Sequence, residues 1–254
     1  MYVHGLHPLT GAVIPRRLDS IQLPPDESPE ALDADSRAVV ASVWAERASS
    51  ELQASLAFNA IASRLVATNA PPDVQYLAAR AVSDEVRHAS LCLSLAQRYG
   101  STAGWPRAMP ADGDDATDLL VLGTCCVNES LGTAFLDATL KRTTAPAVLF
   151  VVQSLLADEV DHGRIGWAHL AGMTDPQRAA IGRTLPALLE ACLRPWRTRL
   201  RVLPVEGVPE HGVLEPRDIR NVLNEALLTL VLPGFDHVGV NIDKGAEWLG
   251  AGIT

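Results

Sequence analysis

The sequence predicts an all-α fold, and three observations lead to this prediction. Alternation of apolar and polar residues, which marks a half-buried strand, is nearly absent. Instead, several long segments carry apolar or acidic residues at every seventh position, so these residues line one side of a helix. The chain also contains a weak internal repeat, in which a helix with one acidic residue on that side is followed by a helix with the sequence Asp-Glu-x-x-His.

An extended arm and two long helices are expected in the first part of the chain. Residues 1–29 combine several prolines with little periodicity, which is typical of irregular structure. A first helix is expected over about residues 30–68 and a second over about 73–99, each with its own seven-residue series. The two series are Trp44, Glu51, Phe58 and Leu65, and Ala78, Glu85 and Cys92.

A long loop separates these two helices from the next two. Residues 100–116 are rich in Gly, Pro and Asp, and a segment of this length could stretch over ~55 Å at ~3.3 Å per residue, the length of a helix bundle. A third helix is expected over about 117–142, and a fourth over about 146–172, where Pro146 suits the first helical turn. Their series are Leu122, Glu129 and Leu136, and Val152, Glu159 and Gly166.

The last part of the chain is expected to add two shorter helices and an irregular tail. The first covers about 176–201 and is broken by Pro186 and Pro195, and the second covers about 217–232. Residues 233–254 are rich in Gly and predict irregular structure. The expected organisation is an N-terminal arm at 1–29, a four-helix unit at 30–172 and a C-terminal helical extension at 173–254 that packs on it.

Composition and charge argue against several classes of protein. The net charge of −9 and the pI of about 5.2 disfavour nucleic-acid binding, which needs a basic surface. The N-terminus lacks the pattern of a secretory signal, and no uninterrupted apolar segment has the length of a membrane span. The four cysteines form no C-x-x-C pair, which favours free thiols and a cytoplasmic location.

Two copies of Glu-x-x-His carry the chemistry. On a helix this spacing places the carboxylate and the imidazole on one face, so each pair can chelate one metal ion. One further glutamate from each remaining helix can bridge or cap the ions. A ligand set of carboxylates and imidazoles is better suited to Fe or Mn than to structural zinc, which is usually held by thiolates. The expected ligands are Glu51, Glu85, His88, Glu129, Glu159 and His162.

A single Glu-x-x-His pair is usually a solvated surface pair, but here the pattern occurs twice in apolar surroundings. Four clustered buried carboxylates are costly without cations. Glu46 is an alternative to Glu51 as the first ligand. Glu51 is preferred because it precedes Glu85 by 34 residues, close to the 30 residues between Glu129 and Glu159.

This order of ligands resembles the ferritin-like di-iron carboxylate superfamily over about residues 40–172. The stretches Glu51-Leu-Gln-Ala-Ser-Leu-Ala-Phe58, Asp84-Glu-Val-Arg-His-Ala89 and Val127-Asn-Glu-Ser130 are similar to bacterial ferritin-like-domain proteins. The resemblance implies a four-helix bundle with a long crossover between its second and third helices. Because the superfamily includes ferroxidases, rubrerythrins, manganese catalases, desaturases and oxygenases, it indicates the metal site more strongly than the reaction.

Two aspartates are candidates for orienting the histidines, since a metal-bound histidine normally donates its other N–H to a carboxylate. The expected pairing is crossed, with Asp84 orienting His162 and Asp158 orienting His88. The alternative is that both aspartates are exposed helix charges.

Small and apolar residues one or two turns from the ligands are candidates for the substrate site. Thr133 and Cys92 are the catalytic candidates, because a Thr and a Cys occupy similar offsets in some oxygenases of the superfamily. The candidate pocket residues are Phe58, Gly132, Cys125 and Gly166. Equally, the small residues could simply allow close helix packing.

The expected function is that of a non-haem di-iron oxidoreductase that uses O2 to oxidise a small organic substrate. Its cofactors are expected to be two Fe ions, with Mn as the alternative, and its electrons to come from a separate reductase or ferredoxin, since no flavin, nicotinamide or iron–sulfur motif is visible. The alternatives are a ferroxidase or iron-handling protein, a manganese catalase-like peroxide scavenger and a structural metal scaffold. The substrate, the reaction outcome and the oligomeric state stay open, with a homodimer as one option.

Overall fold

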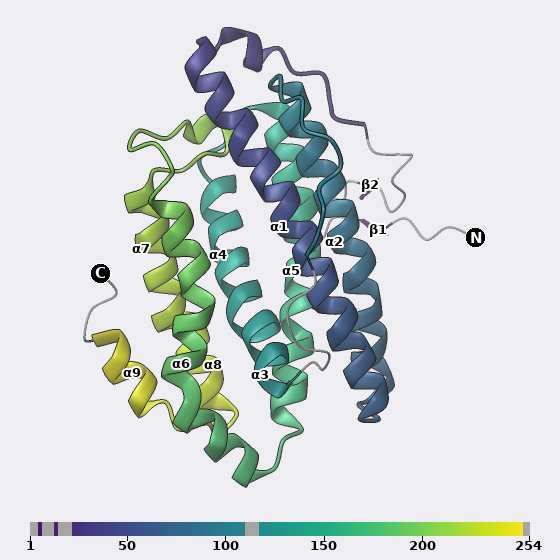
Figure 1. The fold of residues 1–254 in the computed structure, drawn as a ribbon, viewed down its shortest axis with the longest axis vertical. Helices are drawn as coiled ribbons and strands as arrows, with labels where there is room; N and C mark the ends of the chain where they lie inside the picture. The colour runs from purple at the N-terminus through teal and green to yellow at the C-terminus, as the bar shows by residue number, and fades with distance from the viewer. Residues whose placement is uncertain (1–4, 7–12, 15–21, 110–116, 251–254) are drawn as a thin grey trace.

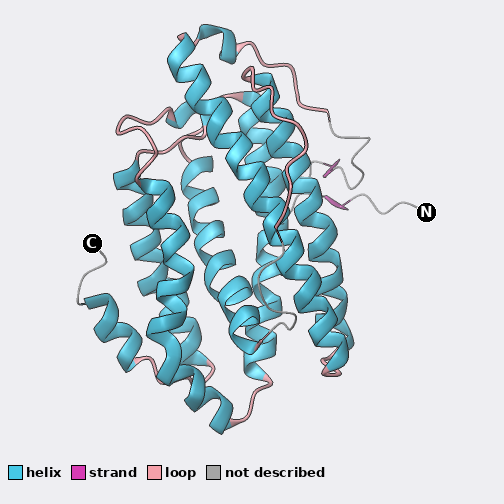
Figure 2. Cartoon of the chain, in the orientation of Figure 1, coloured by secondary structure: helices cyan, strands magenta, loops and turns pink. Residues whose placement is uncertain are grey.

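Helices are the dominant elements of the computed structural model, which confirms the all-α class (Figure 2). One short antiparallel pair, β1 (Gly5–Leu6) and β2 (Val13–Ile14), precedes them. Much of the expected arm at 1–29 and the second part of the expected loop at 100–116 lie outside the described residues. The structure describes residues 5–6, 13–14, 22–109 and 117–250.

The first two helices form a long antiparallel pair. A short 3₁₀ turn, η2 (Ser28–Ala31), leads into α1 (Ala34–Ala67), whose first turn is capped by the side chain of Asp33. After a tight turn, α2 (Pro72–Arg98) returns and packs along α1 (Figure 1).

The third and fourth helices pack beside this pair. The third consists of α3 (Asp118–Val121), a π-helical segment η3 (Leu122–Asn128) and α4 (Glu129–Leu140). The fourth, α5 (Pro146–Ala171), packs against both α2 and α4. In Figure 1, α2 ends at the upper end of the molecule and α3 begins near the lower end, so α2 and α4 run in the same direction.

The C-terminal part contains more helix than the sequence suggests. The helix α6 (Asp175–Leu200) continues through Pro186 and Pro195, so the expectation that they break it is wrong. Each proline removes one backbone hydrogen bond, but the buried apolar side of α6, from Ile181 to Leu193, holds the helix in place. The tail expected to be irregular is largely helical as well. Within that tail lie α8 (Leu232–His237) and α9 (Asp243–Gly250). The helix expected at about 217–232 is present as α7 (Pro216–Ala226), continued by the π-helical η5 (Leu227–Val231), and it follows a 3₁₀ turn η4 (Pro209–His211).

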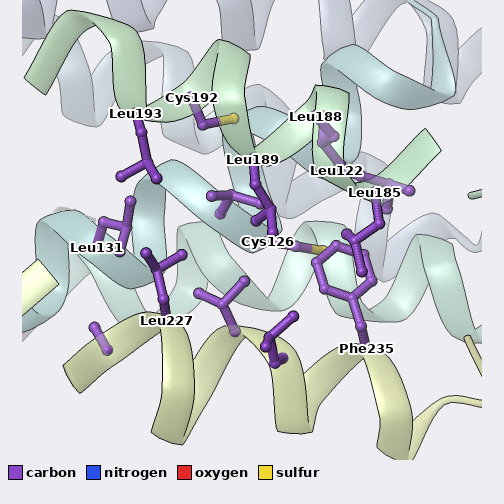
Figure 3. Packing of buried hydrophobic residues seen from close by; sticks show 14 of the residues in the cluster. Leu122, Cys126, Leu131, Leu185, Leu188, Leu189, Cys192, Leu193, Leu227 and Phe235 are labelled. Atoms are coloured by element: carbon purple, nitrogen blue, oxygen red, sulfur yellow. The ribbon is translucent and has the colours of Figure 1, made fainter. Parts of the chain in front are cut away.

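The C-terminal helices share a hydrophobic core with the third helix (Figure 3). Leu122, Cys126 and Leu131 of the third helix meet a row of side chains from α6 and, on the other side, Leu227 and Phe235. The row from α6 contains Leu185, Leu188, Leu189, Cys192 and Leu193. The C-terminal region is therefore packed directly on the helix that carries Glu129.

The third helix is also apolar enough to meet the length and composition of a membrane span, contrary to the expectation from the sequence. The segment is Asp118–Leu140, and 61% of its apolar window is buried inside the protein. A helix that lies in the core of a folded domain has the same composition, and this helix is covered on one side by α5 and on the other by α6 and α7.

Asp26 ties the segment before η2 to the start of α5. Its carboxylate accepts hydrogen bonds from the backbone N–H groups of Ser28, at 2.9 Å, and Ala147, at 3.0 Å. Burial raises the pKa of Asp26, but hydrogen bonds from Ser28 and Ala147 outweigh it, so the pKa lies below its ordinary value. The carboxylate thus supplies the N-terminal cap that α5 lacks at its own preceding residue.

Replacing Asp26 with Ala should lower the free energy of unfolding by about 1–3 kcal/mol, because the buried N–H of Ala147 loses its partner. Urea unfolding at pH 7 measures the change, and Asp26→Asn, which keeps one acceptor oxygen, should cost less. Since the folded pKa is lowered, the stabilisation is present above the unfolded pKa of about 4 and is lost as pH falls through the folded value. Equal stability of Asp26→Ala and the natural protein would contradict the capping role.

Candidate metal centre

The four glutamates and two histidines singled out in the sequence lie together in the interior. One comes from α1, two from α2, one from the first residue of α4 and two from α5, and none is more than 8% exposed. Helical spacing explains the arrangement, because each Glu-x-x-His pair projects its two side chains from one helix face. The residues are Glu51, Glu85, His88, Glu129, Glu159 and His162.

The six residues form two overlapping groups that could each hold a metal ion. Within each group, the potential ligand atoms all lie within 4.8 Å of one another. Glu85 and Glu159 belong to both groups, whereas Glu51 and Glu129 each belong to one. The glutamates of the two Glu-x-x-His pairs are thus the ones placed to bridge. The groups are Glu51, Glu85, His88 and Glu159, and Glu85, Glu129, Glu159 and His162.

Both histidines turn Nδ1 toward the carboxylates. His162 Nδ1 lies 3.0 Å from Glu85 Oε1 and 3.4 Å from Glu159 Oε2. His88 Nδ1 lies 3.6 Å from Glu85 Oε2 and 3.7 Å from Glu159 Oε1. Nδ1 of each ring is therefore the nitrogen available to a metal ion.

Several atoms of this cluster are buried without a hydrogen-bond partner. Three of them, Glu85 Oε2, His88 Nδ1 and His162 Nδ1, face the cluster, and His162 Nε2 is a fourth. Such atoms are rare in folded proteins, because leaving a buried polar atom unsatisfied is costly. A pair of divalent cations would satisfy the three atoms that face the cluster at once, and the mixed oxygen and nitrogen set fits Fe or Mn.

The charges of the cluster also call for cations. Burial raises the pKa of Glu51 to about 7, with Glu85 adding to the rise and Arg47 opposing it. Burial likewise raises the pKa of Glu129, helped by Glu159. Burial lowers the pKa of His88, but Asp158 and Glu85 outweigh it and raise the value to about 9. The cluster therefore attracts positive charge, which protons or metal ions can supply.

The two aspartates lie behind the histidines in the crossed arrangement. His88 Nε2 is 3.4 Å from Asp158 Oδ2, and His162 Nε2 is 3.7 Å from Asp84 Oδ2. Both aspartates are buried, so the alternative that they are exposed helix charges is excluded. Their position is suited to fixing the ring orientation that presents Nδ1 to the cluster.

Three arginines complete the surroundings, and the sequence interpretation missed them. Arg47 Nε lies 2.8 Å from Glu51 Oε1, and Arg80 Nε lies 3.1 Å from Asp84 Oδ2. Arg87 is buried and pairs with Asp158. The first two pairs could have been found from their spacing of four residues on a helix. The third joins residues far apart in the sequence and carries no such signal.

A cleft of about 660 Å³ opens beside two of the glutamates. Glu129 and Glu159 belong to its lining, with Thr133 one turn beyond Glu129 on α4. The opposite wall comes from the C-terminal region, and most of the lining is apolar. The remaining lining residues are Ser130, Val160, Gly163, Arg164, Trp167, Leu230, Pro233, Gly234, His237 and Val238.

None of the other candidate substrate-site residues belongs to the lining of this cleft. Phe58 is fully buried, with its ring centroid 5.1 Å from that of His162. Cys92 is fully buried in the core, and burial with the nearby Glu51 raises the pKa of its thiol well above the ordinary value. A Cβ at Gly132 would meet no atom within 4 Å, and Gly132 does not line this cleft.

Cys125 and Gly166 form a close helix contact rather than a wall of the cleft. A Cβ built on Gly166 would lie 2.7 Å from Cys125 Cβ and 2.7 Å from Cys126 Sγ. Glycine at this position lets α5 approach the π-helical segment η3. Gly166 therefore allows close helix packing, which was the alternative role considered for the small residues.

These features define an all-helical protein with a buried cluster of acidic and histidine side chains that could bind metal, an arrangement compatible with a ferritin-like fold. Comparison with protein-family models, with curated proteins and with solved structures found no match for this chain.

Proposed function

We propose that this chain is a ferritin-like, non-haem di-iron oxidoreductase that uses O2 to oxidise a small apolar substrate. The cleft beside Glu129 and Glu159 carries this proposal. Its volume of about 660 Å³ lies within the range of small-molecule sites, and its walls are mostly apolar. A substrate in this cleft would lie against the metal ligands themselves.

The fold of the first four helices supports the ferritin-like part of the proposal. In that bundle the second and third helices run in the same direction, which requires a long crossover. Here α2 and α4 run in the same direction (Figure 1). The chain after α2 also returns to α1. The side chain of Gln53 on α1 exchanges hydrogen bonds of 2.9 and 3.0 Å with the backbone of Met109.

Each part of the chain has a role in this proposal. Two iron ions, or manganese as the alternative, would be held by the six ligands and would supply the redox chemistry, with O2 as co-substrate and electrons from a separate reductase or ferredoxin. Glu85 and Glu159, which belong to both ligand groups, would help to hold each of the two ions. Asp84 and Asp158 would hold the histidine rings in place. The region around α8 would limit access of water to the cleft.

The C-terminal region favours an oxygenase or oxidase over iron storage. A storage protein needs only the bundle and a route for iron, whereas residues 230–238 build the second wall of an apolar cleft. A ferroxidase or a manganese catalase-like scavenger remains the alternative function, since the ligand set alone fits each of them.

The deciding experiment exposes the Fe(II)-loaded protein to O2 with a chemical reductant and a panel of small apolar compounds. Mass spectrometry should detect a compound that gains one oxygen atom or loses two hydrogen atoms only when the protein, Fe(II) and O2 are all present. Rapid formation of ferric mineral without any change in the compounds would favour iron handling. Evolution of O2 from added hydrogen peroxide by the Mn(II)-loaded protein would favour a catalase.

Filling the cleft should separate catalysis from metal binding. Val160 lines the cleft next to Glu159 and is 53% exposed, so Val160→Trp can place an indole in the open space. Oxidation of any compound found in the panel should fall at least about tenfold, because the substrate loses its position near the ligands, while iron content stays unchanged. Val66→Trp is the matched control, since Val66 is 60% exposed on α1 and does not line the cleft. Unchanged oxidation by Val160→Trp would place the substrate elsewhere.

A further inference from the structure

The two halves of the metal cluster share a common plan but differ in the residues beside their unshared glutamates. Behind each histidine lies an aspartate that is paired with an arginine: Asp158 with Arg87, and Asp84 with Arg80. The unshared glutamates differ. Four residues before Glu51 stands Arg47, whereas four residues before Glu129 stands the uncharged Cys125.

Arg47 is held firmly against Glu51. Its Nε lies 2.8 Å from Glu51 Oε1, and both side chains are 11% exposed. Its guanidinium carbon lies 5.3 Å from the ring centroid of Phe135 and 6.0 Å from that of Trp44. These contacts leave the guanidinium few alternative positions, because its surroundings are packed.

A second arginine adds to the positive charge on this side. Arg199 of α6 is largely buried, and its nearest acidic partner is Glu46, at 3.6 Å. Arg199 also interacts electrostatically with Arg47 and Glu51. In the other half, the ion pair of Glu129 is with His162, at 3.8 Å.

We propose that Arg47 makes the two metal positions unequal, so that the position formed with Glu129 and His162 binds a divalent cation first and more tightly. This inference rests on the two-metal site of the proposed function. Arg47 acts in two ways: its charge repels a cation at the Glu51 and His88 position, and it occupies one of the two oxygens of Glu51. The difference between the two affinities should be at least about tenfold, since a fixed charge near a buried ion is poorly screened.

The geometry gives this order of binding a consequence for the cleft. Glu129 lines the cleft, and Glu51 does not. The tighter position is therefore the one next to the substrate space, and the weaker position lies on the far side, under α1 and the arginines. Arg47 is thus a positioning residue that sets the order of metal binding.

The test is an anaerobic titration of the chelator-treated full-length protein with Mn(II). Binding is measured by calorimetry and by the electron paramagnetic resonance signal of free Mn(II). The natural protein should bind in two steps that differ at least about tenfold in affinity. In Arg47→Met, which removes the charge and keeps an apolar side chain, the second step should tighten by at least about fivefold while the first changes less. Arg47→Gln is a second neutral variant in case the methionine disturbs folding, and Arg47→Lys should keep two unequal steps.

The control is Arg64→Met, because Arg64 lies on the same helix and pairs with Asp118 at 2.6 Å, outside the cluster. It should leave both steps unchanged. Two equal steps in the natural protein, or a spacing that folded neutral variants of Arg47 leave unchanged, would overturn this inference while leaving the two-metal site intact. Failure of the natural protein to bind Mn(II) and Fe(II) would instead overturn the proposed function.

Discussion

Replacing Glu159 with Gln should remove both metal ions from the protein, whereas the same change at Glu51 should remove one. Glu159 belongs to both ligand groups, so its loss takes a negative ligand from each ion. Glu51 belongs to one group, and the other group keeps all of its members. The iron content after anaerobic loading and desalting should fall from about two per chain to near zero for Glu159→Gln and to about one for Glu51→Gln.

Glu46→Gln is the matched control for this experiment. Glu46 is the other acidic candidate on α1, but its side chain is 49% exposed and its ion pair is with Arg199. This variant should keep both ions. If Glu159→Gln and Glu51→Gln each lost only one ion, the inference that Glu159 is a ligand of both ions would be refuted.

Metal binding should raise the melting temperature by on the order of 10–20 °C. Each site that binds only the folded chain adds about 2.7 kcal/mol at a free metal concentration of 100 times Kd. Two sites then add roughly 5 kcal/mol, and each kcal/mol shifts the melting temperature of a protein of this size by about 2–4 °C. Calorimetric or circular dichroism melts with and without saturating Mn(II) at pH 7 measure the shift.

The double variant Glu85→Gln, Glu159→Gln should show no such rise, because it lacks both shared carboxylates. Burial raises the pKa of Glu85 and Glu159, but hydrogen bonding, with His162 among the partners of both, outweighs it and lowers both values. The metal-free double variant should therefore melt no higher than the metal-free natural protein, because the charged carboxylates contribute stability at pH 7. An unchanged melting temperature of the natural protein under saturating metal would contradict a buried two-metal cluster.

Local spacing explains why so much of the cluster could be expected from the sequence. Trp44, Glu51, Phe58 and Leu65 follow one another at seven-residue intervals, and all four are buried on α1. The spacing within each Glu-x-x-His pair similarly fixes the relation of its two side chains. Periodicity along one helix is thus enough to select the inward-facing residues.

Contacts between segments that are distant in the sequence could not be predicted from periodicity along one helix. The cleft is formed by α4 and α5 together with residues 230–238, and no local pattern joins these segments. The two prolines of α6 obey the local rule for helix breakers, but packing against the third helix overrides it. Gly166 resembled a pocket residue because it is small and in line with Glu159, yet its role is set by Cys125 and Cys126 across the interface.

The core that the third helix shares with α6, α7 and α8 links the stability of the two halves of the chain. One side of this helix faces the cluster through Glu129, and the other buries Leu122, Leu131 and their neighbours against the C-terminal helices. Loosening α6 to α8 would expose that apolar side and weaken the support for Glu129. The C-terminal helices and the metal ligands should therefore unfold in one cooperative transition, so that metal binding protects α6 to α8 from local opening although none of their residues belongs to the described ligand groups.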